Sequence, residues 1–522
     1  MAPDAATRMK ADGALSRIGT GRNIFSNLIG GAWIAALTLI ITPMQVNILG
    51  MEAYGLVGFI MTLQMVFSVF DLGLSTTVTR ELARDQSARY ADTLPLLQTA
   101  STIYWILAIV LGAVLMVLAE PLAKFWFNPK SLDLATLEQG IRVIAIYLAL
   151  RWPVALYSGI LSGLRRMDIL NVVKALASSI RLVGGIIVLY IMRDLESFLW
   201  WTAFSSLVEV LAFVVCVYWL HPAMSWMPRI SLQAARDIWR FALSMNALAL
   251  IALLTVQADR LIISKLLPLE QLGFYSLAYS TVSSISLILT AIGSAMLPSF
   301  ASAFGAGRRD IVGQRYDMAC RVMMYAVGFP AFALIFFGKT ILTWWVGIDA
   351  ASGAWLSLAL LAAGFWLGAA YTNAYNLLVA SGRTFGVLVI SLGILVPYIL
   401  ALYLMVQTFS IAGAALAWLI LTVFYALTII PAMHRVAVDS TFMSSLRTIF
   451  IPFLLTGAVC FGAPKLVAEY FAGSDAKSLV HVIMLSVAVL IYAAIGYRLL
   501  GVELRVEVQK YIARFIPGVA SL

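Results

Sequence analysis

Charge is scarce in this chain. Of its 522 residues, only 11% are Asp, Glu, Lys or Arg, whereas 62% are hydrophobic and the mean hydropathy is +0.95. A typical soluble domain carries about 25% charged residues, so the composition excludes one. Apolar runs of about 20 residues, long enough to cross ~30 Å of hydrocarbon as a helix, recur without the alternation typical of a β-barrel. We therefore predict an all-α polytopic membrane protein with about fourteen transmembrane helices.

Cysteine and histidine are also rare. Cys216, Cys320 and Cys460 are odd in number and fall in apolar runs, so no disulfide framework is expected. The three histidines are scattered, which predicts neither a metal site nor a cofactor. The stretch "FGKT" at 337–340 lacks the earlier glycine of a phosphate-binding ATPase loop. Since no connection between apolar runs is long enough for a soluble catalytic domain, we do not expect an enzyme.

Positive charge is distributed unevenly along the chain. Arg8, Lys10, Arg17 and Arg22 precede the first apolar run, and most of the 35 Lys and Arg fall in segments on the same side of the membrane as these four. This bias predicts that both termini are cytoplasmic. It also accounts for the net charge of +10 without a nucleic-acid partner. The first run is too long for a cleaved signal peptide, so we expect an uncleaved first span.

A weak internal repeat divides the chain. At one constant offset Glu52 matches Glu270, and Tyr157 matches Tyr375. The pattern predicts two pseudo-symmetric six-helix lobes in the same orientation, followed by two appended helices. The expected divisions are a cytoplasmic segment at 1–22, an N-terminal lobe at 23–220, a cytoplasmic linker at 221–237, a C-terminal lobe at 238–433, two appended spans at 434–500 and a cytoplasmic amphipathic helix at 501–522.

Several charges fall inside the predicted spans of the N-terminal lobe. Arg151 and Arg181 each lie about 20 Å along their helices, near mid-membrane, and Lys174 lies two turns before Arg181 on the same face. Each central charge costs ~2.5 to 3.5 kcal/mol, so we predict a cavity in which three cations outnumber the single acid, Glu209, and bind an anion. A structural alternative stays open, in which Arg151 or Arg181 pairs with Glu209 and holds helices together.

Asp71 is a further carboxylate in an apolar stretch, about 25 Å along its predicted span. That depth places it near the cytoplasmic end. We favour a role in fixing the end of the helix beside Gly73 over a role in carrying a proton.

The C-terminal lobe has little charge inside its spans, but "GFWLGAAYTNAYNLLVASG" at 364–382 is rich in polar aromatics and amides. Tyr371, Tyr375 and Asn376 could contact sugar hydroxyls and ring faces. Tyr157, the repeat counterpart of Tyr375, joins the predicted substrate-binding residues. For each residue taken singly, ordinary interhelical hydrogen bonding is an equally good interpretation.

The order of several short motifs resembles a known family. These are "NILGMEAYGLVGF" followed by "FDLGLSTTVTRELA", then "ADRLIISKLLPLEQLGFYSLA", "LPSF", "ASGRT" and "IAGAALAW", between about residues 20 and 435. They resemble bacterial polysaccharide transporters, the Wzx-type lipid-linked oligosaccharide flippases of the multidrug/oligosaccharidyl-lipid/polysaccharide exporter superfamily. The resemblance implies a two-lobed fold of twelve or fourteen helices. It also implies a substrate of undecaprenyl diphosphate carrying an oligosaccharide, which moves across the bacterial inner membrane for O-antigen, capsule or exopolysaccharide synthesis.

The family is similar in having a cationic central cavity, a role that Arg151, Lys174 and Arg181 fit by depth and charge. The rival interpretation is a cation-coupled multidrug exporter of the same superfamily, which Glu209 and Asp71 keep open together with H⁺ or Na⁺ coupling. Expected partners are the lipid-linked oligosaccharide and membrane lipids, with a polysaccharide polymerase and glycosyltransferases as candidates. The expected location is the bacterial inner membrane, crossed many times.

Overall fold

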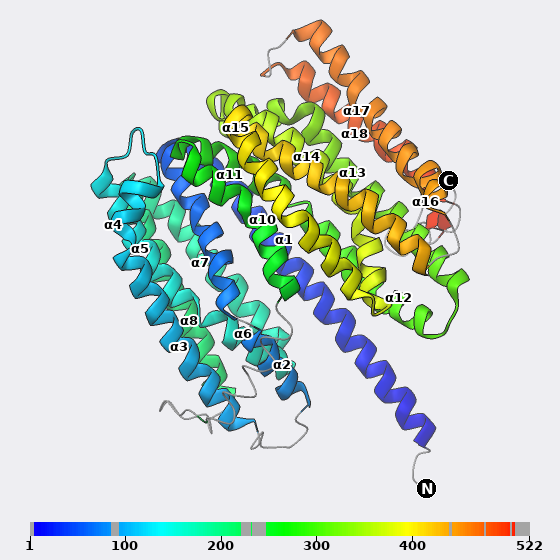
Figure 1. Cartoon of the computed structure of the whole chain (residues 1–522), viewed down its shortest axis with the longest axis horizontal. Coiled ribbons are helices and arrows are strands. Elements are labelled where there is room, and N and C mark those ends of the chain that lie inside the picture. Colours follow the sequence, from blue (N-terminus) through cyan, green and yellow to red (C-terminus); the bar gives the residue numbers. More distant parts are fainter. Residues whose placement is uncertain are drawn as a thin grey trace. The chain divides into compact units, whose positions relative to one another are not determined.

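The computed structural model describes residues 5–71, 73–84, 93–220, 231, 247–437, 441–473, 477–501 and 504–506 (Figure 1). Within these ranges every regular element is a helix, which confirms the all-α prediction. Eleven helices there are long and apolar enough to cross a membrane, and α1 and α15 each join two helices across a kink. The predicted linker at 221–237 and the predicted C-terminal amphipathic helix fall mainly outside the described residues.

The chain divides into two compact units. The N-terminal unit comprises residues 1–257 and 268–270, and the C-terminal unit comprises 258–267 and 271–522. The N-terminal unit contains α1 (Ala5–Phe67), η1 (Ser68–Asp71), α2 (Leu74–Arg84), α3 (Leu94–Val117), α4 (Ala119–Pro121), η2 (Leu122–Trp126), α5 (Leu134–Arg151), α6 (Val154–Gly163), α7 (Met167–Met192) and α8 (Leu195–Leu220).

Helix α10 (Ala247–Leu266) crosses the boundary between the units. The C-terminal unit continues with α11 (Leu269–Ser283), α12 (Ser286–Gly305), α13 (Arg309–Val346), α14 (Ile348–Ala380), α15 (Thr384–Ala437), α16 (Phe442–Ser445), η3 (Leu446–Phe450), α17 (Ile451–Ala472) and α18 (Leu479–Leu499). The appended helices α17 and α18 pack on α13 (Figure 1). Gly457 of α17 leaves room there for the ring of Phe332.

Left-handed backbone turns recur at a constant separation along the chain. Helix α6 is followed by Arg165 at φ 58°, and α14 is followed by Gly382 at φ 76°. Arg193 ends α7 at φ 56°, and Ser410 at φ 56° marks the kink within α15. Both pairs have the same separation along the chain, and only glycine adopts this left-handed conformation at little cost. The same rare backbone geometry therefore recurs after α6 and α14, and again at the end of α7 and at the kink within α15.

Two predicted spans of the N-terminal unit are interrupted part-way. The predicted span that contains Arg151 is split between α5 and α6 because Pro153 has no N–H to continue the helical hydrogen bonds. The second part of α1 ends at Phe67 and is followed by η1 and then Gly73 at φ 76°, before α2 begins at Leu74. Residues at both interruptions line a cavity within this unit.

Close packing fixes α6 against α2. A Cβ atom added to Gly163 would lie 2.8 Å from the Cβ of Leu82 and 2.9 Å from the carbonyl oxygen of Thr79. One turn earlier, the hydroxyl of Thr79 donates a hydrogen bond of 2.9 Å to the carbonyl oxygen of Gly159. The spacing of Gly159 and Gly163 is the small-residue pattern that lets membrane helices approach closely.

Candidate functional site

A cavity of about 570 Å³ lies within the N-terminal unit. Its walls come from both parts of α1 and from η1, α5, α6, α7 and α8. Two interrupted helices supply part of the wall, with Ser68 and Asp71 at one break and Arg151 and Trp152 at the other. The cavity therefore forms where the regular helix surface is lost.

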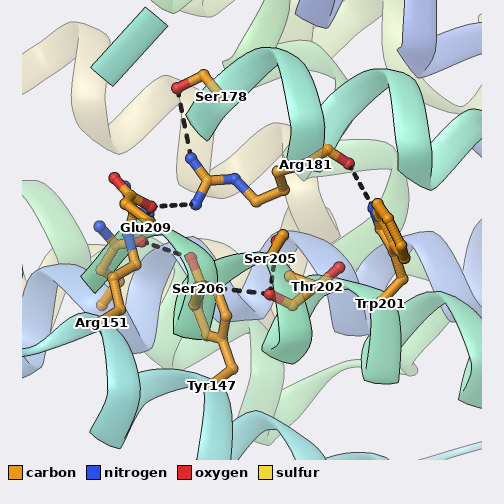
Figure 2. A network of polar contacts seen from close by, with 10 residues as sticks. Tyr147, Arg151, Ser178, Arg181, Trp201, Thr202, Ser205, Ser206 and Glu209 are labelled. Atoms are coloured by element: carbon orange, nitrogen blue, oxygen red, sulfur yellow. Dashed lines mark hydrogen bonds and ion pairs between the residues drawn. The ribbon is translucent and has the colours of Figure 1, made fainter. Parts of the chain in front are cut away.

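Three charged side chains meet at this cavity, and we call Arg151, Arg181 and Glu209 the ion triad (Figure 2). Nη1 of Arg181 donates a hydrogen bond of 2.8 Å to Oε2 of Glu209, and Nη1 of Arg151 donates to the same oxygen. The Glu209 side chain is 3% exposed, whereas those of Arg151 and Arg181 are 21% and 16% exposed. The structural alternative expected either Arg151 or Arg181 to pair with Glu209, and both arginines do so. Both also line the cavity.

The arginines retain donors that Glu209 does not use. Nε of Arg151 is buried and has no hydrogen-bond acceptor among the described residues. Nη2 of Arg181 has a single weak contact, 3.5 Å to Oγ of Ser178. A guanidinium offers five N–H groups, so two guanidiniums on one carboxylate oxygen are far from saturated. The site therefore has donors left for an anion that presents several oxygen atoms.

Lys174 lies on α7, two turns before Arg181, and its exposed side chain lines the same cavity. Among the described residues it has no ion-pair partner in hydrogen-bonding range. Its charge interacts with those of Glu209 and Arg151. Lys174 and Arg181 therefore lie on the same face of α7, and that face lines the cavity.

Asp71 requires a correction to the expected charge balance. The sequence placed one acid, Glu209, among three cations, but Asp71 also lines the cavity because η1 interrupts its helix. Its carboxylate accepts hydrogen bonds from the backbone N–H and the hydroxyl of Ser75, at 3.2 and 2.7 Å, and from the hydroxyl of Tyr104. The lining thus holds three cations and two carboxylates, a net charge of +1.

The structure does not bring every predicted site residue to this cavity. Tyr157 is 1% exposed and lies in the packing between α3 and α6, where its hydroxyl is 3.0 Å from Oγ of Ser101 and accepts a 3.1 Å hydrogen bond from Trp105. Tyr371, Tyr375 and Asn376 lie on α14, in the C-terminal unit. The ring of Tyr371 packs 5.5 Å from that of Tyr425.

Among the lining residues that were missed in the sequence are Gln64, Tyr147, Trp152 and Ser178. The hydroxyl of Tyr147 donates a hydrogen bond of 3.1 Å to Oε1 of Gln64. Their sequence positions carried a usable signal, because Gln64 lies two turns before Asp71, Tyr147 one turn before Arg151 and Ser178 one turn after Lys174. Residues at those spacings share a helix face with the predicted charges.

Comparisons with known proteins give a family match and a similar curated protein. The family model described as "Polysaccharide biosynthesis protein" matches residues 20–304. A Shigella flexneri protein named "Putative O-antigen transporter" is 23% identical over 389 residues, which cover 73% of this chain and 89% of that protein.

Two solved structures are similar in fold. "Lipid II flippase MurJ, inward closed conformation" has a TM-score of 0.66 at 13% identity, covering 93% of this chain and 99% of that one. An inward-facing multidrug resistance MATE family transporter of the MOP superfamily has a TM-score of 0.61 at 15% identity, covering 79% and 94%. At these identities the likeness establishes the fold alone. These four matches carry names from polysaccharide biosynthesis, transport or lipid flipping.

Proposed function

Because the chain belongs to the polysaccharide biosynthesis protein family, whose model covers more than half of it, we propose that it is a flippase. It moves an oligosaccharide linked to undecaprenyl diphosphate from the inner to the outer leaflet of the bacterial inner membrane, for surface polysaccharide synthesis. The observation that carries the proposal is the cavity in the N-terminal unit. Arg151, Arg181 and Lys174 all line this cavity, and the helices around it are long and apolar enough to cross a membrane.

The chemistry of the carrier explains why such a cavity is needed. An unpaired diphosphate cannot enter hydrocarbon, since removing even one ion from water costs several kcal/mol or more. Arginine offers permanently charged, bidentate recognition of phosphoryl oxygens, and lysine adds a mobile point charge. The polyprenyl tail remains in the bilayer while the cavity shelters the head group. Alternating access then requires the two six-helix lobes to rock about the bound head group.

The sugars need contacts of a different kind. In the cavity, Gln64 and Tyr147 form a polar pair that can exchange its mutual hydrogen bond for one to a sugar hydroxyl. On α14 of the C-terminal unit, Tyr371, Tyr375 and Asn376 remain our proposed glycan contacts. Coupling to H⁺ or Na⁺ also remains a proposal, with Asp71 and Glu209 as its candidate carboxylates.

The experiment compares two arginines in the ion triad with one outside it. We expect Arg151→Ala and Arg181→Ala to abolish surface polysaccharide in a complemented deletion strain, while both proteins still insert into the membrane. Arg142→Ala is the matched control, because Arg142 lies on α5 as Arg151 does but pairs with Glu138 at 2.6 Å and is half exposed, away from the cavity. It should restore export fully.

Two results would remove the proposal. Wild-type export in both single mutants would remove the site assignment. Normal surface polysaccharide in the deletion strain, without carrier-linked glycan accumulating on the cytoplasmic leaflet, would support the multidrug exporter instead.

A further inference from the structure

Glu209 sits where an anionic substrate would have to bind. Its Oε2 atom accepts a hydrogen bond from each of Arg151 and Arg181, and its side chain is 3% exposed. We propose that Glu209 is an internal competitor of the diphosphate: its carboxylate occupies the position between the two guanidinium groups that a phosphoryl group takes, and the two anions exchange there. The inference rests on the proposed function and assigns Glu209 a role in controlling affinity.

The donor geometry favours exchange over simultaneous binding. One oxygen of Glu209 holds one Nη atom of each arginine, while Nε of Arg151 is buried without an acceptor among the described residues. A phosphoryl group presents several oxygens and can therefore engage both guanidiniums in bidentate fashion. The phosphoryl group forms hydrogen bonds with guanidinium N–H groups that Glu209 leaves unused. These bonds offset the loss of the contacts between Glu209 and the arginines.

Charge leads to the same conclusion. While Glu209 holds the two arginines, Lys174 is the cation of the described cavity lining that has no carboxylate in contact. The lining as a whole, with its three cations and two carboxylates, then presents a net charge of +1 to the two negative charges of a diphosphate diester. When Glu209 moves off the arginines, the net charge stays the same, but two guanidinium groups contact the diphosphate directly. A diphosphate can thus be held well only when Glu209 yields its place.

Competition of this kind suits a transporter. A site must bind well enough to load its substrate and weakly enough to release it on the other side. Two buried arginines without a competitor would hold a diphosphate tightly and slow its release. Glu209 returns to the arginines as the substrate leaves. The two guanidinium groups are therefore paired with an anion at every stage, first with the diphosphate and then with Glu209.

The test uses the full chain in lipid nanodiscs and compares Glu209→Gln with Glu138→Gln. Both variants remove the charge of a glutamate that pairs with an arginine, but Glu138 pairs with Arg142 outside the cavity. The probes are undecaprenyl diphosphate, inorganic pyrophosphate and uncharged undecaprenol. We expect Glu209→Gln to bind both diphosphates at least about tenfold more tightly, equivalent to ~1.4 kcal/mol, and to transport with lowered KM and lowered kcat. Glu138→Gln should match the wild type.

The outcomes separate this inference from the proposed function. Equal or weaker diphosphate binding by Glu209→Gln would overturn the competitor role, as would tighter binding of undecaprenol, since that lipid carries no phosphate. Failure of the wild type and of Glu138→Gln to bind undecaprenyl diphosphate would instead overturn the proposed function. A preference of the wild type for undecaprenyl diphosphate over pyrophosphate assigns the bound anion to the lipid. If Glu209→Gln does not fold, Glu209→Asp, which shortens the carboxylate's reach, should show a smaller gain; no gain refutes the inference.

Discussion

Replacing Lys174 with Gln tests the anion site while leaving the ion triad intact. The Lys174 side chain is exposed to the cavity and has no ion-pair partner among the described residues, so its removal strands no buried charge. We expect the free energy of unfolding to change by about 0.5 kcal/mol or less. A hydrogen bond from a charged group contributes about 1.5 to 3 kcal/mol. Losing one to a phosphoryl oxygen should therefore weaken diphosphate binding about 10- to 150-fold.

The assay measures the Kd of undecaprenyl diphosphate and the melting temperature of the same nanodisc sample. Lys124→Gln is the matched control, because Lys124 pairs with Glu120 at 2.5 Å in η2 and does not line the cavity. It should leave the Kd unchanged. An unchanged Kd in Lys174→Gln would refute the assignment of Lys174 to the anion site. A large fall in its melting temperature would refute the reasoning that its charge is free of structural partners.

Three further predictions concern the packing around the site. Arg151→Ala should lower the free energy of unfolding by about 1 to 3 kcal/mol, and adding Glu209→Gln should recover part of the loss; strictly additive melting shifts would contradict their coupling. Tyr157→Phe should cost about 1 kcal/mol of stability without changing diphosphate affinity, since its hydroxyl contacts α3, and a raised Kd would return Tyr157 to the substrate site. Gly163→Ala should destabilise by about 1 to 3 kcal/mol because its Cβ would lie 2.8 Å from a side-chain carbon of α2. Gly386→Ala, with nothing within 4 Å of its Cβ, should melt at or slightly above the wild-type temperature, since alanine is the better helix former.

The helices could be predicted because their cause is local. A run of apolar residues long enough to cross hydrocarbon must satisfy its own backbone hydrogen bonds, so length and composition are sufficient. The expected depth of Arg151 and Arg181 rests on the helical rise alone. Their direction followed as well, because a charge at mid-membrane avoids lipid and must face protein or a cavity.

Tyrosine gave no comparable guide. A buried tyrosine can face lipid, a neighbouring helix or a cavity, and a span that is apolar all round has no polar face to fix its rotation. The match of Tyr157 to Tyr375 said nothing of the side that Tyr157 faces, which is the packing with α3. The same ambiguity hid Tyr147, whose position one turn before Arg151 was the available signal.

Asp71 shows a second limit, which is the interruption of a helix. Its depth was counted along one continuous span, but η1 and the positive φ of Gly73 break that span. Apolar length does not reveal such a break, because every residue around it still belongs in the membrane. The break places Asp71 in the cavity lining and lowers the expected net charge there by one.

In our proposal the ion triad serves packing and binding through the same atoms, so the structural alternative and the proposed site do not exclude each other. As a fastener alone the triad is a poor choice, since well-packed apolar residues of similar volume often stabilise a protein as well as or better than a buried ion pair. Two arginines on one carboxylate also leave a surplus positive charge, and here that surplus borders a chamber that Lys174 shares. A surplus cation beside a cavity stabilises the lobe less than it stabilises an anion bound within it, which is why we assign the triad to the substrate.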